Sequence, residues 1–263
     1  MAHPFSPPAH AEVDHSGDGS TPAAFPLWIA LIALAIFTGP NLIVLFTGSL
    51  GELAEQSASD GSLGLVQTLA TLVLQLAIFG LALVPLALSR TPLKVAVGSA
   101  RRSVLFTGVG LVLGVAITVI VLVFNALLIG TFGQSTPVEQ SLLPSPSDSL
   151  GVVLVLAVLV IVVAPITEEL LFRGVLFASL RRKIGMHPAA LLSGAVFAMV
   201  HVEVLASQPL ALGGLTLAGV LLAYAFHYTK SLHVAIVMHA VYNGTAFGVM
   251  LLLSELEGLG LPV

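Results

Sequence analysis

The sequence contains no cysteine, and only 8% of its 263 residues are charged. Without cysteine there is no disulfide framework, thiolate zinc site or iron–sulfur cluster. Soluble domains carry roughly 25% charged residues, so this chain has too little charge to cover a water-exposed surface. Disorder of the whole chain is excluded because 57% of its residues are hydrophobic. The composition predicts an all-α, polytopic helical membrane protein.

Phosphate-binding glycine loops, nucleotide fingerprints and basic nucleic-acid patches are missing as well. We therefore expect neither a nucleotide nor a nucleic acid as a partner. The internal repeat that marks many transporters is also missing. The partners we expect are the lipid bilayer and whatever the membrane-embedded polar residues act on.

Residues 1–24 form the only strongly polar stretch, which predicts a disordered tail. This tail has no Lys or Arg, so it lacks the positive region of a signal peptide. Apolar runs of about 20 residues, the length that crosses a bilayer, recur along the rest. They predict about seven spans, at Phe25–Phe46, Leu63–Leu88, Val104–Ile129, Leu150–Phe172, Pro188–Leu205, Leu210–Tyr228 and Leu232–Leu253. The fourth continues with amphipathic character to Arg182, and an eighth span results if it is split.

Charged residues alternate between the two sides of this predicted topology. Apart from Arg173, every basic residue falls in the loop after the second, fourth or sixth span. The acids beyond the tail and outside the spans fall in the other loops or at the C-terminus. The positive-inside rule then places the N-terminus in the cytoplasm and the C-terminus outside.

Two adjacent carboxylates, Glu168 and Glu169, interrupt the fourth apolar run. A charged side chain in hydrocarbon costs on the order of 3 kcal/mol, so their presence needs a reason. Glu169 and Arg173 have the i,i+4 spacing and orientation of a helical ion pair. Glu168 is rotated about 100° away on the helix, so it is left unpaired. Pro165 removes a helix hydrogen bond in the preceding turn and predicts a kink beside the carboxylates.

Histidines interrupt two later spans. Phe197 and His201 are spaced i,i+4, which predicts that ring and imidazole stack on one helix face. His239 and Asn243 have the same spacing and point from one face of the last span. Taken alone, His201 is more typical of a hydrogen-bonded packing residue than of a catalyst, and the pair of His239 and Asn243 is as typical of interhelical hydrogen bonding as of a catalytic site. Together with a free carboxylate they form a set able to hydrolyse an amide: a carboxylate and imidazole to activate water, and an imidazole and carboxamide to bind an oxyanion.

The segments EELLFR, FAMVH and HAVYN resemble the signature motifs EExxxR, FxxxH and HxxxN of the CAAX protease and bacteriocin-processing (CPBP) family. This family of intramembrane endopeptidases includes the type II CAAX prenyl endopeptidases. The resemblance covers about Leu150–Leu253. It implies a water-accessible cavity open toward the cytoplasmic side. It also implies that Glu168 and His201 activate water and that His239 and Asn243 stabilise the oxyanion, while Glu169, Arg173 and Phe197 order the site.

The resemblance divides the chain into a cytoplasmic tail (1–24), a three-helix membrane region (25–149), a catalytic core (150–254) and a short C-terminal tail (255–263). We therefore expect an endopeptidase of a bacterial plasma membrane that cleaves a peptide or a membrane-protein segment. A metal-free glutamate mechanism is favoured, and the sequence does not specify a cofactor. Zinc held by Glu168, His201 and His239, as in a metalloprotease, stays open. Two other functions stay open: a proton-coupled transporter using the same residues as a relay, and an inactive immunity or scaffold protein.

Overall fold

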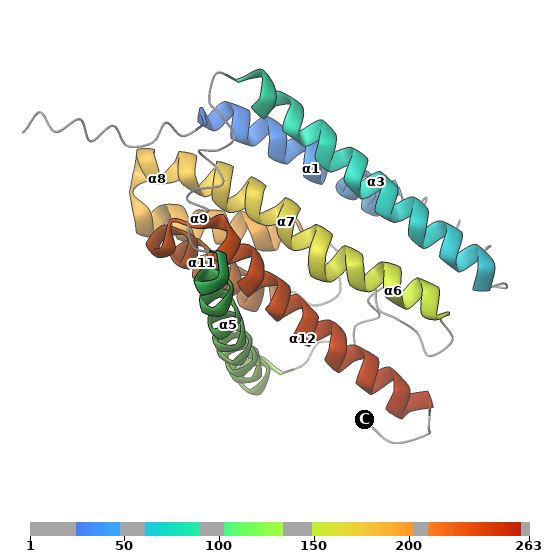
Figure 1. Ribbon diagram of the computed structural model, residues 1–263. Helices are drawn as coiled ribbons and strands as arrows, with labels where there is room; N and C mark the ends of the chain where they lie inside the picture. Colours follow the sequence, from blue (N-terminus) through green and yellow to red (C-terminus); the bar gives the residue numbers. More distant parts are fainter. Residues whose placement is uncertain (1–24, 48–60, 90–102, 134–148, 202–209, 259–263) are drawn as a thin grey trace, which may run out of the picture.

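A computed structural model describes residues 25–47, 61–89, 103–133, 149–201 and 210–258 of the chain (Figure 1). The regular elements in these ranges are all helices, and together they form a polytopic bundle. They are α1 (Leu27–Thr47), α3 (Gly61–Leu88), α5 (Ser103–Phe132), α6 (Leu150–Val158), the π-helix η1 (Leu159–Val163), α7 (Ala164–Glu169), the π-helix η2 (Leu170–Phe177), α8 (Ala178–Ile184), α9 (Met186–Met199), α11 (Ala211–Thr229) and α12 (Leu232–Gly258). The prediction of an all-α membrane protein is confirmed.

Among the described residues, five helical runs are long and apolar enough to cross a membrane. They are Gly64–Leu88, Leu105–Phe132, Leu150–Ile184, Ala211–Thr229 and Leu232–Leu256. Two shorter apolar stretches, Leu27–Gly39 within α1 and Met186–Met199 (α9), lie in the first and fifth predicted spans. The chain is thus a multi-pass membrane protein, because helices satisfy every backbone group internally in lipid.

The observed helix bounds can be compared with the predicted ones where the structure describes the chain. The fourth span is one continuous run from Leu150 to Ile184, so the described helix is not split. The last helix continues to Gly258, past the boundary predicted after residue 254. The tail 1–24, the predicted loops that hold Arg90, Lys94, Arg101 and Arg102, and the end of the fifth predicted span lie outside the described residues.

The long run from α6 to α8 forms the centre of the fold (Figure 1). On one side, α1 packs against η2 and α8, while α3 packs against α1 and α6. On the other side, α12 packs along η1 and α7, and α5 packs along α12. α11 packs with α9, α5 and α12. This arrangement brings helices from both ends of the chain onto the segment that carries Glu168 and Glu169.

Glycines allow two of these helix pairs to approach closely. In α5, a Cβ atom added to Gly110 would lie 2.7 Å from the Cβ atom of Val237 in α12. A Cβ atom added to Gly114 would lie 2.5 Å from that of Val241 in the same helix. Between α9 and α11, a Cβ on Gly219 would lie 2.7 Å from the Cα of Gly194. Small residues at such contacts are typical of helix packing in membranes, where dispersion rather than the hydrophobic effect holds helices together.

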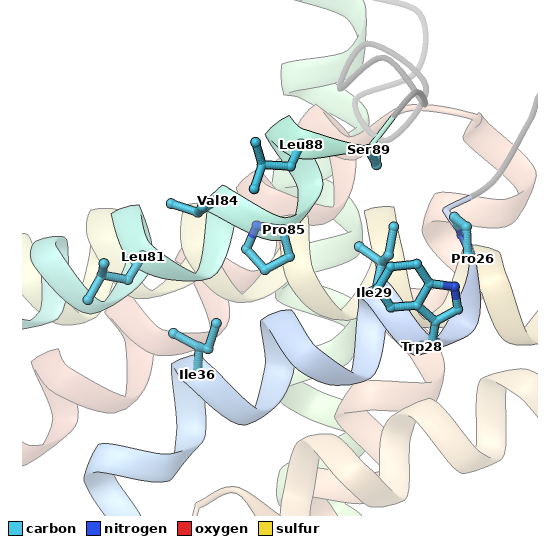
Figure 2. Close-up of a pocket in the computed structure, with 9 residues that line it drawn as sticks. All are labelled: Pro26, Trp28, Ile29, Ile36, Leu81, Val84, Pro85, Leu88 and Ser89. Carbon is cyan, nitrogen blue, oxygen red and sulfur yellow. The ribbon is translucent and has the colours of Figure 1, made fainter.

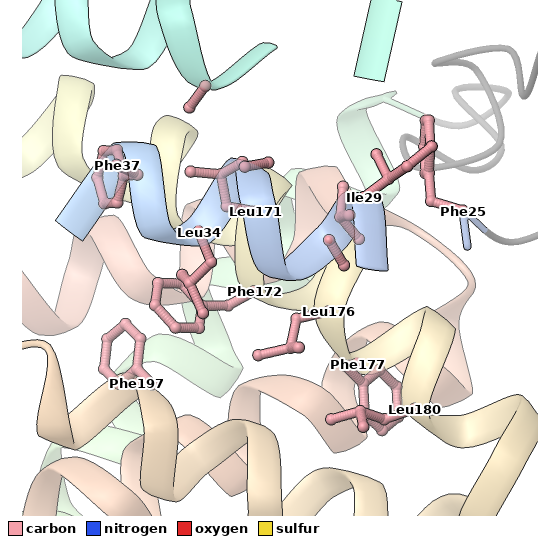
Figure 3. Packing of buried hydrophobic residues seen from close by; sticks show 14 of the residues in the cluster. Phe25, Ile29, Leu34, Phe37, Leu171, Phe172, Leu176, Phe177, Leu180 and Phe197 are labelled. Carbon is pink, nitrogen blue, oxygen red and sulfur yellow. The ribbon is translucent and has the colours of Figure 1, made fainter. Parts of the chain in front are cut away.

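The main apolar core joins α1 to the second half of the long run (Figure 3). Phe172, Phe177 and Phe197 are among its largest fully buried side chains. The Phe172 and Phe197 rings meet edge to face, with centroids 5.2 Å apart. This core fixes η2 against α9, directly beside the polar residues described below.

An apolar groove of about 760 Å³ lies between α1 and α3 (Figure 2). It is lined by residues of the two helices, including Trp28, Ile36, Leu81 and Pro85. None of the predicted site residues lines this groove. The groove is therefore separate from the candidate site.

Candidate active site

The two carboxylates lie at the end of α7, between two π-helical segments. Pro165 occupies the first turn of α7, where its missing N–H is tolerated, and η1 ends just before it. Glu169 is the last residue before η2, which continues the helix with i→i+5 bonding. The wider π turns change the direction in which successive side chains point. Such turns are common at functional sites.

Glu169 is fully buried and forms the centre of a hydrogen-bond network. Its Oε1 accepts from Arg173 Nη1 at 2.7 Å and from His239 Nδ1 at 2.8 Å. Arg173 is equally buried, at 0% exposure, and its Nη2 donates to the backbone oxygen of Gly219 at 3.1 Å. The guanidinium also lies 4.6 Å from the centre of the Phe197 ring. The ion pair expected from the i,i+4 spacing is present, and it extends to two further helices.

Glu168 points to a different place and lacks such partners. Its side chain is 14% exposed, and its Oε2 lies 4.0 Å from His201 Nε2 and 3.9 Å from His239 Nε2. Both separations exceed hydrogen-bond length. In the described part of the chain this buried oxygen has no hydrogen-bond partner. This carboxylate oxygen thus lies within 4.0 Å of one imidazole nitrogen from each of two other elements.

His201 follows the end of α9 and is held by Phe197. Its Nδ1 lies 2.7 Å from the backbone oxygen of Phe197, and the two rings are 4.8 Å apart. Because a carbonyl oxygen only accepts, Nδ1 carries the hydrogen. In the neutral ring, Nε2 therefore presents its lone pair toward Glu168. Phe197 also contacts His239, with ring centroids 5.7 Å apart, so one ring supports both imidazoles.

The sequence alone places the two imidazoles at unequal depths, because His201 is about 13 residues beyond Pro188 but His239 only about 7 beyond Leu232. In the structure both imidazoles nevertheless reach the carboxylate, because His201 Nε2 and His239 Nε2 lie 4.0 and 3.9 Å from Glu168 Oε2.

Asn243 lies one turn beyond His239 on α12. Its Nδ2 donates to the backbone oxygen of Val160 in η1 at 2.9 Å. The amide nitrogen carries a second hydrogen, which this bond does not use. Sequence reasoning predicts the shared face with His239. It does not predict the hydrogen bond from Asn243 to Val160 or the one from Arg173 to Gly219. Both acceptors are backbone oxygens, and the spacing of side chains in the sequence carries no information about them.

Glu168, His201 and His239 are of residue types that bind zinc, but their separations differ from those of a zinc site. Zinc bonds of about 2.0–2.2 Å in tetrahedral geometry place neighbouring ligand atoms roughly 3.4 Å apart. The separations of 3.9 and 4.0 Å from Glu168 to the imidazoles are wider. Within the described ranges, no three His, Asp or Glu residues are grouped as metal ligands. The metalloprotease alternative therefore has no support from this geometry.

The fold and the buried polar residues together define a class, that of polytopic helical membrane proteins with a carboxylate and two imidazoles between their spans. Residues 150–245 match the family model described as "Type II CAAX prenyl endopeptidase Rce1-like". No curated protein and no solved structure matches the chain. The matched region contains the three motifs EELLFR, FAMVH and HAVYN. Residues 150–245, less than half of the chain, thus resemble the CAAX protease (CPBP) family, a family of membrane endopeptidases, and the resemblance expected from the sequence is confirmed over this region.

Proposed function

We propose that this protein is an intramembrane endopeptidase in which Glu168 and His201 activate a water molecule for attack on a peptide bond. One observation carries the proposal: Glu168 Oε2, buried and without a partner among the described residues, faces His201 Nε2 and His239 Nε2 at 4.0 and 3.9 Å. A water molecule that lies about 2.8 Å from Glu168 Oε2 and about 2.8 Å from His201 Nε2 fits the separation of these two atoms.

The tautomer of His201 supports the role of a base. Because Nδ1 donates to Phe197, the neutral ring accepts at Nε2. A water between Glu168 and His201 would donate both hydrogens, one to the carboxylate and one to the imidazole. The lone pairs of its oxygen are then directed away from the two bases, toward a substrate carbonyl carbon. Glu168 takes the proton as the bond forms and later returns it to the departing amine.

His239 and Asn243 are proposed to stabilise the oxyanion. Asn243 retains one N–H beyond its bond to Val160. His239 donates at Nε2 in its doubly protonated form, since Nδ1 already donates to Glu169. Preorganised donors of this kind contribute roughly 3–4 kcal/mol to transition-state stabilisation. Glu169, Arg173 and Phe197 are proposed as positioning residues that hold the imidazoles and do not touch the reacting atoms.

The proposed substrate is a peptide or a membrane-protein segment, of which a prenylated CAAX protein is one candidate. Residues 150–254 would form the catalytic part, and residues 25–149 a three-helix region beside it. We propose a bacterial plasma membrane as the location, with the N-terminus and the opening of the active-site cavity on the cytoplasmic side. The charge alternation of the sequence supports this orientation.

The experiment is time-dependent cleavage of a quenched peptide library by the purified full chain. We expect Glu168→Gln to reduce the rate by about 10²–10⁴-fold, the usual contribution of a general base. Glu255→Gln provides the matched control, because Glu255 is an exposed acid in the last turns of α12. Cleavage by Glu168→Gln at the wild-type rate would contradict the proposal.

A further inference from the structure

A second group of polar residues lies where α8, α9 and α11 meet at one end of the bundle (Figure 1). Arg181 Nη1 is 2.6 Å from His227 Nδ1, which joins α8 to α11. His187 Nδ1, in α9, is 2.8 Å from the hydroxyl of Tyr224. Lys230 follows α11 directly. Basic residues from three elements are thus gathered outside the candidate active site.

We propose that Arg181, His227 and Lys230 form a binding site for the phosphate group of an anionic phospholipid. The first argument is the charge of this cluster. Among the residues that the structure describes, no carboxylate forms an ion pair with Arg181 or Lys230. Partial desolvation and the positive charge of Arg181 lower the pKa of the Lys230 amine. A bound anion would offset the positive charge that these side chains place at this end of the bundle.

The second argument is the direction of the donors. Arginine has no acceptor, so Arg181 donates to His227 and the Nδ1 of His227 carries the lone pair. The hydrogen of the neutral ring then sits on Nε2, where it is available to an anion. The guanidinium of Arg181 also lies over the Phe177 ring, 6.0 Å from its centre, in a cation–π contact. The cluster offers donors and cations, which is what phosphate oxygens require.

The third argument is the backbone of Lys230. It has φ 53°, ψ 28°, and is the one residue other than glycine with positive φ among those described. This left-handed position ends α11, where glycine is the common residue because it has no Cβ. A lysine here is strained, and strain of this kind is concentrated at functional sites. The side chain of Lys230 therefore has a use that glycine could not supply.

The location favours a lipid phosphate over other anions. Thr229 and Ile184 are the last residues of two membrane spans, so the cluster lies where hydrocarbon gives way to headgroups. Tyr224 and Tyr228 stack beside it with centroids 6.3 Å apart, and Tyr228 is 71% exposed. Tyrosines with an apolar ring and a polar hydroxyl are typical of this interface. Basic pockets between spans at this level are a known form of anionic headgroup recognition.

The test is native mass spectrometry of the delipidated full chain, titrated with phosphatidylglycerol or with phosphatidylcholine of the same acyl chains. We expect wild type to bind phosphatidylglycerol more tightly. Lys230→Gly and Arg181→Gln should each weaken phosphatidylglycerol binding about fivefold, the equivalent of one cation near a lipid headgroup. Binding of phosphatidylcholine should not change. Lys183→Gln is the control, because Lys183 is exposed on α8 and carries the same charge.

Lys230→Gly keeps the test independent of misfolding, since glycine relieves the left-handed strain and should not lower the melting temperature. An unchanged phosphatidylglycerol affinity in Lys230→Gly, or an equal loss in Lys183→Gln, would overturn the proposal. Two competitors distinguish other anions. Displacement of phosphatidylglycerol by equimolar inorganic phosphate, or by a peptide with a free but not an amidated C-terminus, would assign the site to a soluble anion or to a peptide carboxylate instead.

Discussion

Glu169 and His239, 70 residues apart in the chain, share a hydrogen bond of 2.8 Å between a carboxylate oxygen and the imidazole Nδ1. Because Arg173 donates to the same oxygen at 2.7 Å, this carboxylate links a cation on its own helix to an imidazole on another. The bond sets the tautomer of His239 and directs its Nε2 toward Glu168. Two neighbouring glutamates of one motif thus have different surroundings: Oε1 of Glu169 accepts two hydrogen bonds, whereas Oε2 of Glu168 has no hydrogen-bond partner among the described residues.

Glu169→Gln should destabilise the protein strongly. The change leaves the buried Arg173 without its counter-charge, which costs about 3–5 kcal/mol when a buried ion pair is broken. Thermal unfolding in detergent or nanodiscs measures the loss, and Glu255→Gln serves as the control for removal of an exposed acid. A Glu169→Gln variant that is as heat-stable as wild type yet inactive would instead make Glu169 a chemical participant.

Replacing His239 should destabilise the protein more than replacing His201, whereas either replacement should abolish peptide cleavage. His239 is 3% exposed and bonded to Glu169, whereas His201 is 30% exposed and bonded only to a backbone oxygen. We expect His239→Ala to cost about 2–4 kcal/mol, through a cavity and a lost charged hydrogen bond. His201→Ala should cost about 1 kcal/mol or less. Both variants should lose peptide cleavage, and paired melting and cleavage assays test this. Full activity in either variant would contradict its assigned role.

Contacts between residues close in the chain were predictable from the sequence. The ion pair of Glu169 with Arg173 follows from i,i+4 spacing on a helix. Phe197 and His201 have the same spacing and are in contact, although His201 lies just past the end of α9. The single unpaired carboxylate, Glu168, follows from the same geometry. The bond from His239 to Glu169 was not predictable, because it depends on the rotation and depth of α12 relative to α7. That rotation and depth follow from the packing of α12 against α7, η1 and α5, which apolar composition does not encode.

Some features of the helices, like the bond between His239 and Glu169, could not be predicted from the sequence. The sequence predicts a kink at Pro165; the structure shows that the helix continues through this residue and that π-helical segments lie on either side of α7, which the sequence does not predict. π turns have no residue signature of their own, since they arise where packing favours one extra residue in a turn. The fifth predicted span likewise has the hydrophobicity of a full crossing, whereas α9 ends at Met199. Apolar residues in a short helix and in a membrane span look alike in composition.

Gly219→Ala should disturb both packing and the site. An added Cβ would lie 2.7 Å from the Cα of Gly194, so α9 and α11 must separate. Arg173 donates to the backbone oxygen of Gly219, so the same shift weakens the support of Glu169. We expect a lower melting temperature and reduced cleavage. Gly108→Ala is the matched control, because nothing lies within 4 Å of its added Cβ, and alanine should be neutral or stabilising in the helix. Equal melting temperatures for the two variants would contradict this account of the α9–α11 contact.

Metal removal and pH together test the identity of the nucleophile. If Glu168 and His201 act directly on water, cleavage should survive exhaustive treatment with a membrane-permeant chelator. The rate should also follow a bell-shaped pH profile, since one group must accept a proton and another must donate one. If a zinc ion generated the nucleophile, chelation would abolish cleavage and stoichiometric zinc would restore it. The separations of 3.9 and 4.0 Å from Glu168 to the imidazoles fit a bridging water better than tetrahedral zinc. We therefore expect activity without metal, and reversible loss of cleavage on chelation, restored by zinc, would show this expectation to be wrong.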